Sequence, residues 1–302
     1  MKFTVEYPIV AAGYDPELVG AAGMTRVAQA VEQHGYDAIA FSEHPAPSYK
    51  WLQAGGHDSL DQTSALAFCA AVTQRVRLMT YAMVLPYHNP LVAAKALSTV
   101  DLLSGGRVTV VAGTGYMRSE FFALGADMAA RNEYFDEATE VLRGAWTEVP
   151  FSHEGKHVTA KAVVSVPRPF QPGGPPILVG GNSVLSRRRA ARHQGWSPLM
   201  VSPEAAKMTR TPGISTIEEL AARIAEVRAA AVEQQGASAS TTVQVQTAQC
   251  RFLQDPGSVD EHRDHLGRLA EAGVDSFVVR PPGDSVAHAV DALQNYAETF
   301  LD

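Results

Sequence analysis

The stretch FTVEYPIVAAGYDPELVGAAGMTRVAQAVEQHGYDAIAFS, residues 3–42, decides the fold. It begins with a β-rich run at 3–7 and ends with a second one at 37–42. Between them, apolar residues recur at the i, i+3, i+4, i+7 spacing of one helix face, at Met24, Val27, Ala28 and Val31. A strand, a helix and a second strand in this order predict a parallel βαβ unit.

The same alternation continues along the chain. Further β-rich runs lie at 77–85, 108–113, 177–180, 196–201, 242–247 and 276–280, and helical spacing recurs within 134–145, 217–227 and 286–300. Eight parallel strands alternating with helices are the number that closes a (β/α)8 TIM barrel. A doubly wound sheet is the alternative, but its first strand is usually followed by G-x-G-x-x-G, which YPIVAAG at 7–13 does not match. We therefore predict an α/β fold, a TIM barrel formed as a single domain by residues 1–302.

Three segments exceed what a minimal barrel requires. Residues 46–63 are expected to form a loop after the second strand, residues 151–176 an extra hairpin, and residues 202–215 a loop after the sixth strand. The first and third follow strands directly, so they are expected at the C-terminal face of the barrel, where TIM-barrel enzymes hold their active sites.

Composition excludes several classes of protein. The 302 residues are 46% hydrophobic and 19% charged, as in ordinary globular chains, and the formal net charge of −7 does not suit a nucleic-acid-binding protein. No apolar run approaches the roughly 20 residues needed to span a bilayer, and the N-terminal stretch does not resemble a signal peptide. Cys69 and Cys250 lie too far apart for a disulfide framework or a metal site. We expect a cytoplasmic protein with a small-molecule substrate, without a nucleic-acid or membrane partner.

His44 and Glu43 end the second strand in FSEHP, residues 41–45. A histidine at the top of a barrel strand can donate or accept a proton near neutral pH, and Glu43 can orient its ring or contact a ligand. The alternative is a pair of loop residues that make a local hydrogen bond.

Two glycine-containing turns follow later strands. Gly180, Gly181 and Asn182 precede a helix capped by Ser183, an arrangement that favours phosphate binding but is also common in ordinary turns. The second turn consists of Gly113, Thr114, Gly115 and Tyr116. Its glycines suggest a backbone pressed against a flat ligand, although close packing of a helix on a strand would require the same glycines.

Other polar clusters give weaker signals. The arginines at 187–189 and 192 suggest a solvated helix face, with one arginine reaching a ligand as the alternative. His262 and His265 share a helix face, but without further ligands we predict no metal site. Met79, Met83 and Met117 are expected to fill the barrel.

Three longer stretches carry a family resemblance. They are FSEHPAP at 41–47, the segment from RVRLMTYAMVLPYHNP to MRSEFFALG at 75–125, and PPILVGGNSVLSRRRAAR at 175–192. Together they resemble the luciferase-like monooxygenase superfamily, and within it the branch that depends on the deazaflavin coenzyme F420. The resemblance extends over nearly the whole chain.

The resemblance implies a homodimeric (β/α)8 barrel with the deazaflavin at its C-terminal mouth. It implies a bulge and a non-prolyl cis peptide at Tyr81–Ala82 that back the cofactor ring, and it gives His44 the position of the acid/base, with Glu43 as a second catalytic residue. The cofactor-binding residues that it implies are Tyr81, Ala82, Met83, Gly113, Thr114, Gly115 and Tyr116, with Gly180, Gly181 and Asn182 at the phosphate.

The function that follows is an F420-dependent oxidoreductase that transfers a hydride between the deazaflavin and a small organic substrate. One alternative is an FMN-dependent monooxygenase that uses dioxygen, in which His44 would assist the oxygen chemistry. The other is a flavin-binding protein without turnover.

Overall fold

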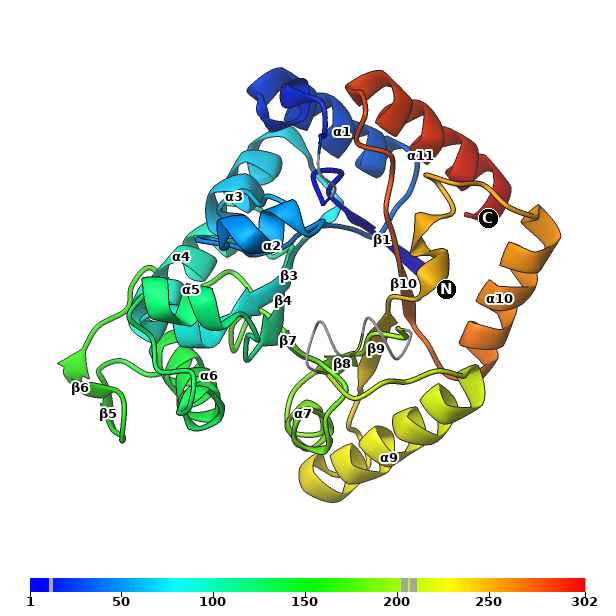
Figure 1. Ribbon diagram of the computed structural model, residues 1–302. Coiled ribbons are helices and arrows are strands. Elements are labelled where there is room, and N and C mark those ends of the chain that lie inside the picture. The colour runs from blue at the N-terminus through cyan, green and yellow to red at the C-terminus, as the bar shows by residue number, and fades with distance from the viewer. Residues whose placement is uncertain (11–12, 202–205, 207–210, 302) are drawn as a thin grey trace.

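The computed structural model describes residues 1–10, 13–201, 206 and 211–301. Within these residues, eight parallel strands close into a barrel in the order β1-β10-β9-β8-β7-β4-β3-β2 (Figure 1). Their bounds are β1 Lys2–Glu6, β2 Ala38–Phe41, β3 Arg77–Val84, β4 Val108–Gly113, β7 Ile177–Gly180, β8 Gly195–Ser197, β9 Thr242–Val245 and β10 Ser276–Val279. The predicted TIM barrel is confirmed.

A helix packs on the outside of the barrel after each barrel strand (Figure 1). These helices are α1 Ala21–Gln33, α3 Gln62–Val72, α4 Pro90–Leu103, α6 Arg131–Thr147, α7 Val184–Ala190, α9 Ile217–Gln235, α10 Val259–Glu271 and α11 Val286–Phe300. Shorter helices lie in the connections, at η1 Pro16–Val19, α2 Tyr49–Gln53, η2 Leu85–Tyr87, α5 Arg118–Ala123 and η3 Ala248–Arg251. No helix in the described part of the chain is long and apolar enough to cross a membrane.

The strand predictions for β4 and β7 agree with the structure at both ends, whereas β8 is shorter than the predicted run at 196–201. Pro198 explains the difference, since it has no N–H to donate to a neighbouring strand. Beyond it, only an isolated bridge joins Leu199 to Gln246.

The prediction that residues 46–63 form a loop is partly wrong. Helix α2 lies inside this segment, with Ser48 as its N-cap, and Asp61 caps α3 at the end of the segment. The segment does lie at the C-terminal end of β2, as expected. Of the predicted loop at 202–215, residues 202–205 and 207–210 lie outside the described residues.

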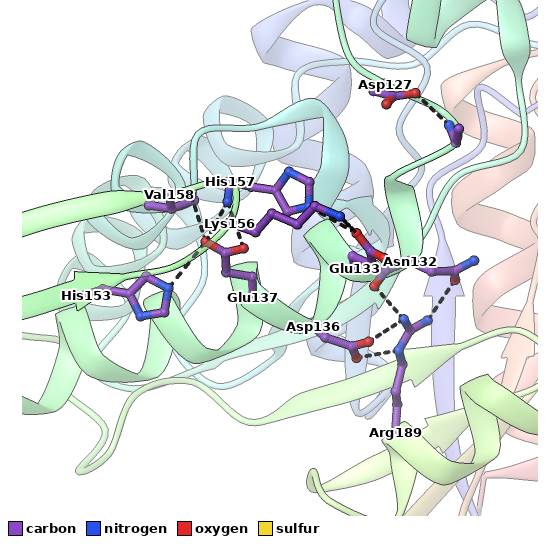
Figure 2. A network of polar contacts seen from close by, with 11 residues as sticks. Asp127, Asn132, Glu133, Asp136, Glu137, His153, Lys156, His157, Val158 and Arg189 are labelled. Carbon is purple, nitrogen blue, oxygen red and sulfur yellow. Dashed lines mark hydrogen bonds and ion pairs between the residues drawn. The ribbon is translucent and has the colours of Figure 1, made fainter.

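The predicted extra hairpin within 151–176 is present. Strands β5 Phe151–Glu154 and β6 Thr159–Val163 pair antiparallel and project from α6, outside the barrel (Figure 1). Figure 2 shows how α6 holds the hairpin: the Glu137 carboxylate accepts hydrogen bonds from the backbone N–H groups of His157 and Val158.

Two apolar layers fill the molecule. The outer layer lies between strands and helices, and a smaller cluster fills the barrel interior, formed by Ala38, Ala40, Met79, Val111 and Leu178 with Tyr81 and Ala82 packed against it. Met79 therefore fills the barrel as predicted. Met83 does not, because the bulge in β3 turns it into the outer layer. Met117 is buried but belongs to neither cluster.

Candidate active site

His44 follows β2 at the C-terminal mouth of the barrel, and only 10% of its side chain is exposed. Its Nδ1 lies 3.3 Å from Oε2 of Glu120, and its backbone N–H donates to the Ser59 hydroxyl. The ring packs 4.5 Å from that of Trp51, measured between centroids, and 6.1 Å from that of Tyr116. The second-strand histidine is thus oriented by a buried carboxylate.

Glu120 is a site residue that the sequence did not reveal. It lies on α5 and is 1% exposed. Besides the contact with His44, it accepts hydrogen bonds from the Tyr87 hydroxyl at 3.1 Å and from the Ala46 N–H at 3.4 Å. Three donors converge on one carboxylate, which accounts for the fixed position of the imidazole.

Glu43 does not orient His44. Its carboxylate accepts from the Val84 N–H at 2.5 Å and contacts Nε2 of His88 at 2.8 Å. Burial opposes a charge on His88, but the hydrogen bond that His88 makes to Glu43 and the negative charges of Glu43 and Asp61 together outweigh it, so the pKa of His88 is raised above its usual value. The structure therefore places Glu43 where it fixes the end of β3.

The end of β3 has the expected irregularity. Its register against β4 shifts between Tyr81 and Met83, and the Tyr81–Ala82 peptide is cis. The Tyr81 hydroxyl points into the barrel toward Ser197, where burial raises its pKa well above the usual value. Neither hydroxyl forms a well-aligned hydrogen bond with a described residue.

Ala82, Gly113 and Gly180 lie together at the ends of the adjacent strands β3, β4 and β7. A Cβ on Gly113 would lie 3.5 Å from that of Ala82, and one on Gly180 would lie 3.8 Å away, both ordinary contacts. Neither glycine has a positive φ. Packing therefore does not require these glycines, and we call Ala82, Gly113 and Gly180, which carry no side chain larger than a methyl group, the apolar floor.

The neighbouring turn has a packing role. Gly115 has φ +73°, and a Cβ there would lie 2.7 Å from Val84 and 3.0 Å from Phe121, so glycine is required. Thr114 is half-buried. Tyr116 faces His44, and burial, followed by the nearby Glu120, raises the pKa of Tyr116 to about 12.

Asn182 connects loops at the mouth. Its amide group donates to the carbonyls of Leu199 and Pro212, both at 2.8 Å, and its carbonyl accepts from the Leu199 N–H. The backbone N–H of Gly181 donates to the backbone carbonyl of Ser197, and the backbone N–H of Asn182 donates to the Thr211 hydroxyl. The predicted phosphate contact at these residues stays a prediction, and both amide hydrogens of the Asn182 side chain are already used.

The arginines of α7 and the turn after it differ in burial. Arg189 is buried and forms a bidentate pair with Asp136 on α6, with a further bond to Asn132 (Figure 2). Arg187 donates to the carbonyl of Asn182. Only Arg188 and Arg192 are exposed, so the prediction of a solvated face is right for these two and wrong for Arg189.

A second cluster of polar side chains, which no sequence pattern indicates, lies inside the barrel. Arg280, after β10, donates from Nε to Glu6 at 2.5 Å, and Gln246 donates to the same carboxylate at 2.8 Å. These residues end β1, β9 and β10, across the barrel from the apolar floor. The guanidinium charge is therefore compensated within the protein.

His262 and His265 make hydrogen bonds within the protein. His262 contacts Gln249 through Nδ1 and the Tyr296 hydroxyl through Nε2, and His265 contacts Thr247. Among the described residues, no group of three or more potential ligands could hold a metal ion.

These features define a class: a (β/α)8 barrel that carries, at the C-terminal ends of its strands, a carboxylate-bound histidine after β2 and the apolar floor on β3, β4 and β7. The family model described as luciferase-like monooxygenase matches residues 1–250, and the chain belongs to this family.

Curated relatives match over part of their length. An uncharacterized protein of Mycobacterium tuberculosis is 32% identical over 182 residues, which cover 56% of this chain and 62% of that protein. An FMNH2-dependent dimethylsulfone monooxygenase of Pseudomonas putida is 27% identical over 175 residues, 57% of this chain and 46% of that enzyme. The matched region thus spans less than two thirds of either relative.

Solved structures share the fold over the whole chain. The monooxygenase RslO1 of Streptomyces bottropensis superimposes with a TM-score of 0.82 at 22% identity, covering 100% of this chain and 99% of that one. The coenzyme F420-dependent tetrahydromethanopterin reductase of Methanopyrus kandleri gives a TM-score of 0.74 at 15% identity, covering 99% and 98%. At these identities the likeness shows the shared fold.

Proposed function

We propose that this protein is an F420-dependent oxidoreductase that transfers a hydride between the deazaflavin and a small organic substrate. The observation that carries the proposal is His44, held by Glu120 at the mouth of the barrel near the glycine floor. We further propose that it acts as a homodimer of single-domain chains, as the family resemblance implies.

The residues at the mouth fit a flat ring system. Ala82, Gly113 and Gly180 present no side chain larger than a methyl group, and a Cβ at either glycine would be in ordinary van der Waals contact with Ala82. A planar ring that lies against this floor would therefore meet no larger side chain from these three positions. When bound there, the deazaflavin would supply the hydride acceptor or donor.

His44 would move the proton that accompanies hydride transfer. A carboxylate only accepts hydrogen bonds, so Nδ1 of His44 carries the hydrogen that points to Glu120, and Nε2 remains for a substrate. The carboxylate would stabilise the imidazolium that forms when Nε2 accepts a proton. Trp51, on α2, packs against the imidazole of His44 and limits the contact of this imidazole with water.

The second candidate is an FMN-dependent monooxygenase. The similarity to the Pseudomonas putida enzyme, whose name specifies FMNH2, favours this alternative. The same floor would accept the ring of FMN, so the geometry alone does not separate the two cofactors.

Titration of the purified protein with F420 and with FMN, each oxidised and reduced, separates these candidates by fluorescence quenching. We expect micromolar binding of F420 and far weaker binding of FMN. A clear preference for FMN would make dioxygen consumption the next assay and would refute the F420 proposal. Binding of neither cofactor would refute both candidates.

The His44→Ala variant tests the role of the imidazole. We expect turnover to fall by about 10²-fold or more, the usual contribution of a general acid or base, while cofactor affinity stays within a few-fold. The His288→Ala variant is the control, because His288 is exposed on α11. Equal loss of turnover and of cofactor affinity in His44→Ala would make His44 a cofactor-binding residue instead.

A further inference from the structure

The end of β3 is held by a pair of polar side chains. The Glu43 carboxylate accepts from the backbone N–H of Val84 through Oε2, at 2.5 Å, and its Oε1 lies 2.8 Å from Nε2 of His88. Only 8% of the Glu43 side chain is exposed, against 29% of the His88 side chain. A buried carboxylate is costly unless donors satisfy its oxygens, and Val84 and His88 supply one donor each.

Val84 connects this pair to the apolar floor. In the register of β3 against β4, Val84 is the partner of Gly113, and the bulge of β3 lies just before it. A Cβ on Gly115 would lie 2.7 Å from the Val84 side chain, so the turn after β4 also packs against Val84. A displacement of Val84 would therefore disturb both strand ends that carry the floor residues Ala82 and Gly113.

His88 is itself fixed by its surroundings. Its backbone carbonyl accepts from the Tyr134 hydroxyl of α6 at 2.8 Å, and its backbone N–H donates to the Leu85 carbonyl at 3.1 Å. The next residue, Asn89, caps α4 with its side chain. The imidazole is therefore a fixed point that can position the Glu43 carboxylate.

The charges around His88 favour its imidazolium form. Glu43 approaches it from the end of β2, Asp61 lies within electrostatic reach at the N-cap of α3, and the Tyr134 hydroxyl contacts its backbone from α6. Although burial opposes a charge, the hydrogen bond to Glu43 and the charges of Glu43 and Asp61 hold the pKa of His88 above its usual value. A charge-assisted hydrogen bond is about twice as strong as a neutral one.

Resting on the proposed function, we propose that His88 is a positioning residue for the cofactor: through Glu43 it fixes the end of β3 and with it the apolar floor against which the cofactor ring lies. His88 keeps the carboxylate on the Val84 N–H, so the floor has its binding geometry before the cofactor arrives. Such preorganisation raises affinity, because less ordering remains to be done on binding.

Cofactor binding should depend on pH through this contact. The charge-assisted bond is fully present below about pH 6.5, the usual pKa of histidine, and is lost as the pH rises through the raised pKa of His88. Cofactor affinity should fall over the same range. His88→Gln places a neutral donor near the Nε2 position, so it should not show this part of the pH dependence.

The F420 affinities of the wild type and of His88→Gln, measured by fluorescence quenching at pH 6 and pH 9, test this role. The dissociation constant of His88→Gln should exceed that of the wild type by about 5- to 10-fold at pH 6 and should be nearly equal to it at pH 9. Titration of the cofactor itself and of the other histidines cancels in this ratio. His88→Leu has no donor and should bind more weakly than His88→Gln at both pH values, by about 3-fold or more.

Amide hydrogen exchange of Val84 in the cofactor-free protein is a readout that does not depend on F420. At pH 7 we expect faster exchange in His88→Leu than in the wild type, with His88→Gln between them. His153→Leu is the matched control, because His153 also lies beside a largely buried glutamate, 3.3 Å from Glu137, but on the hairpin outside the barrel. This control should change neither the exchange of Val84 nor the cofactor affinity, and thermal unfolding checks that each variant is folded.

Equal exchange of Val84 in the wild type and both His88 variants would overturn the assignment of His88, whether or not F420 binds. A ratio of dissociation constants that stays constant between pH 6 and pH 9 would overturn it as well. If FMN proves to be the ligand, the same ratio is measured with FMN. Faster exchange of Val84 in His88→Leu, without binding of F420 to any of the proteins, would refute the F420 proposal alone.

Discussion

His44 and Glu43 are neighbours in the chain, yet their side chains contact different elements. Successive side chains of an extended segment point to opposite sides, so one reaches α5 and the other reaches β3 and His88. The sequence indicates that both residues lie at the end of the second strand. It does not indicate which of them faces the site, because their partners are more than 40 residues away.

The roles of the Glu43 and Glu120 carboxylates can be distinguished with isosteric variants. Glu120→Gln replaces an acceptor of three hydrogen bonds with a group that also donates, so we expect turnover to fall about 10- to 100-fold, corresponding to about 1–3 kcal/mol. Glu43→Gln leaves the contact between His44 and Glu120 intact and should mainly lower the unfolding temperature. Steady-state kinetics and thermal unfolding measure both effects. A larger loss of turnover in Glu43→Gln would reverse the roles assigned here.

At the scale of elements, most strands could be predicted because β-branched runs bounded by glycine or proline are local signals. Helices α3 and α4 give no amphipathic signal, since their sequences QTSALAFCAAV and PLVAAKALSTVDLL are apolar on most sides and show little periodicity. Helix α2 is too short for a periodic pattern. The Val, Pro and Gly content of residues 151–176 predicts the hairpin of β5 and β6, but it does not predict that the Glu137 carboxylate holds this hairpin.

The hairpin should depend on one side chain of α6. Burial opposes ionisation of Glu137, but the N–H groups of Val158 and His157 outweigh it and hold the pKa of Glu137 below its usual value. Glu137→Gln should therefore destabilise the hairpin by about 1–3 kcal/mol, seen as faster amide exchange at His157 and Val158. Glu133→Gln is the matched control, because Glu133 also contacts the hairpin, at Lys156 and His157, but does so at the exposed surface, where an ion pair contributes little (Figure 2). Cofactor affinity should not change in either variant, and unchanged exchange in Glu137→Gln would contradict the assignment.

At the scale of the whole molecule, the site joins residues from distant parts of the chain. Glu120 lies 76 positions from His44, and Arg280 lies 274 from Glu6. Barrel closure brings β1 beside β10, so the contact between Glu6 and Arg280 depends on the complete fold. No local pattern predicts them, whereas the glycine turns and His44 could be found because each lies directly after its own strand.

Buried histidines should make the stability of the whole protein depend on pH. Burial, followed by Arg143 and Arg192, lowers the pKa of His193 to about 4, and burial followed by His265 lowers that of His262 to about 4. The unfolded chain, with an ordinary histidine pKa of about 6.5, therefore binds more protons than the folded chain between these values. Stability is fully present above about pH 6.5 and is lost as the pH falls toward 4.

Urea unfolding of the wild type at pH 7 and pH 5 measures this loss, which we expect to be about 1 kcal/mol for each histidine once solvent screening is allowed for. In His262→Gln the loss between the two pH values should be smaller by about that amount, although the variant is less stable at pH 7 because the contacts with Gln249 and Tyr296 are altered. The exposed His288→Gln variant should lose as much as the wild type. His88, whose raised pKa acts in the opposite direction, is present in all three proteins and cancels in the comparison. Equal losses in the wild type and His262→Gln would show that His262 is not held neutral by the fold.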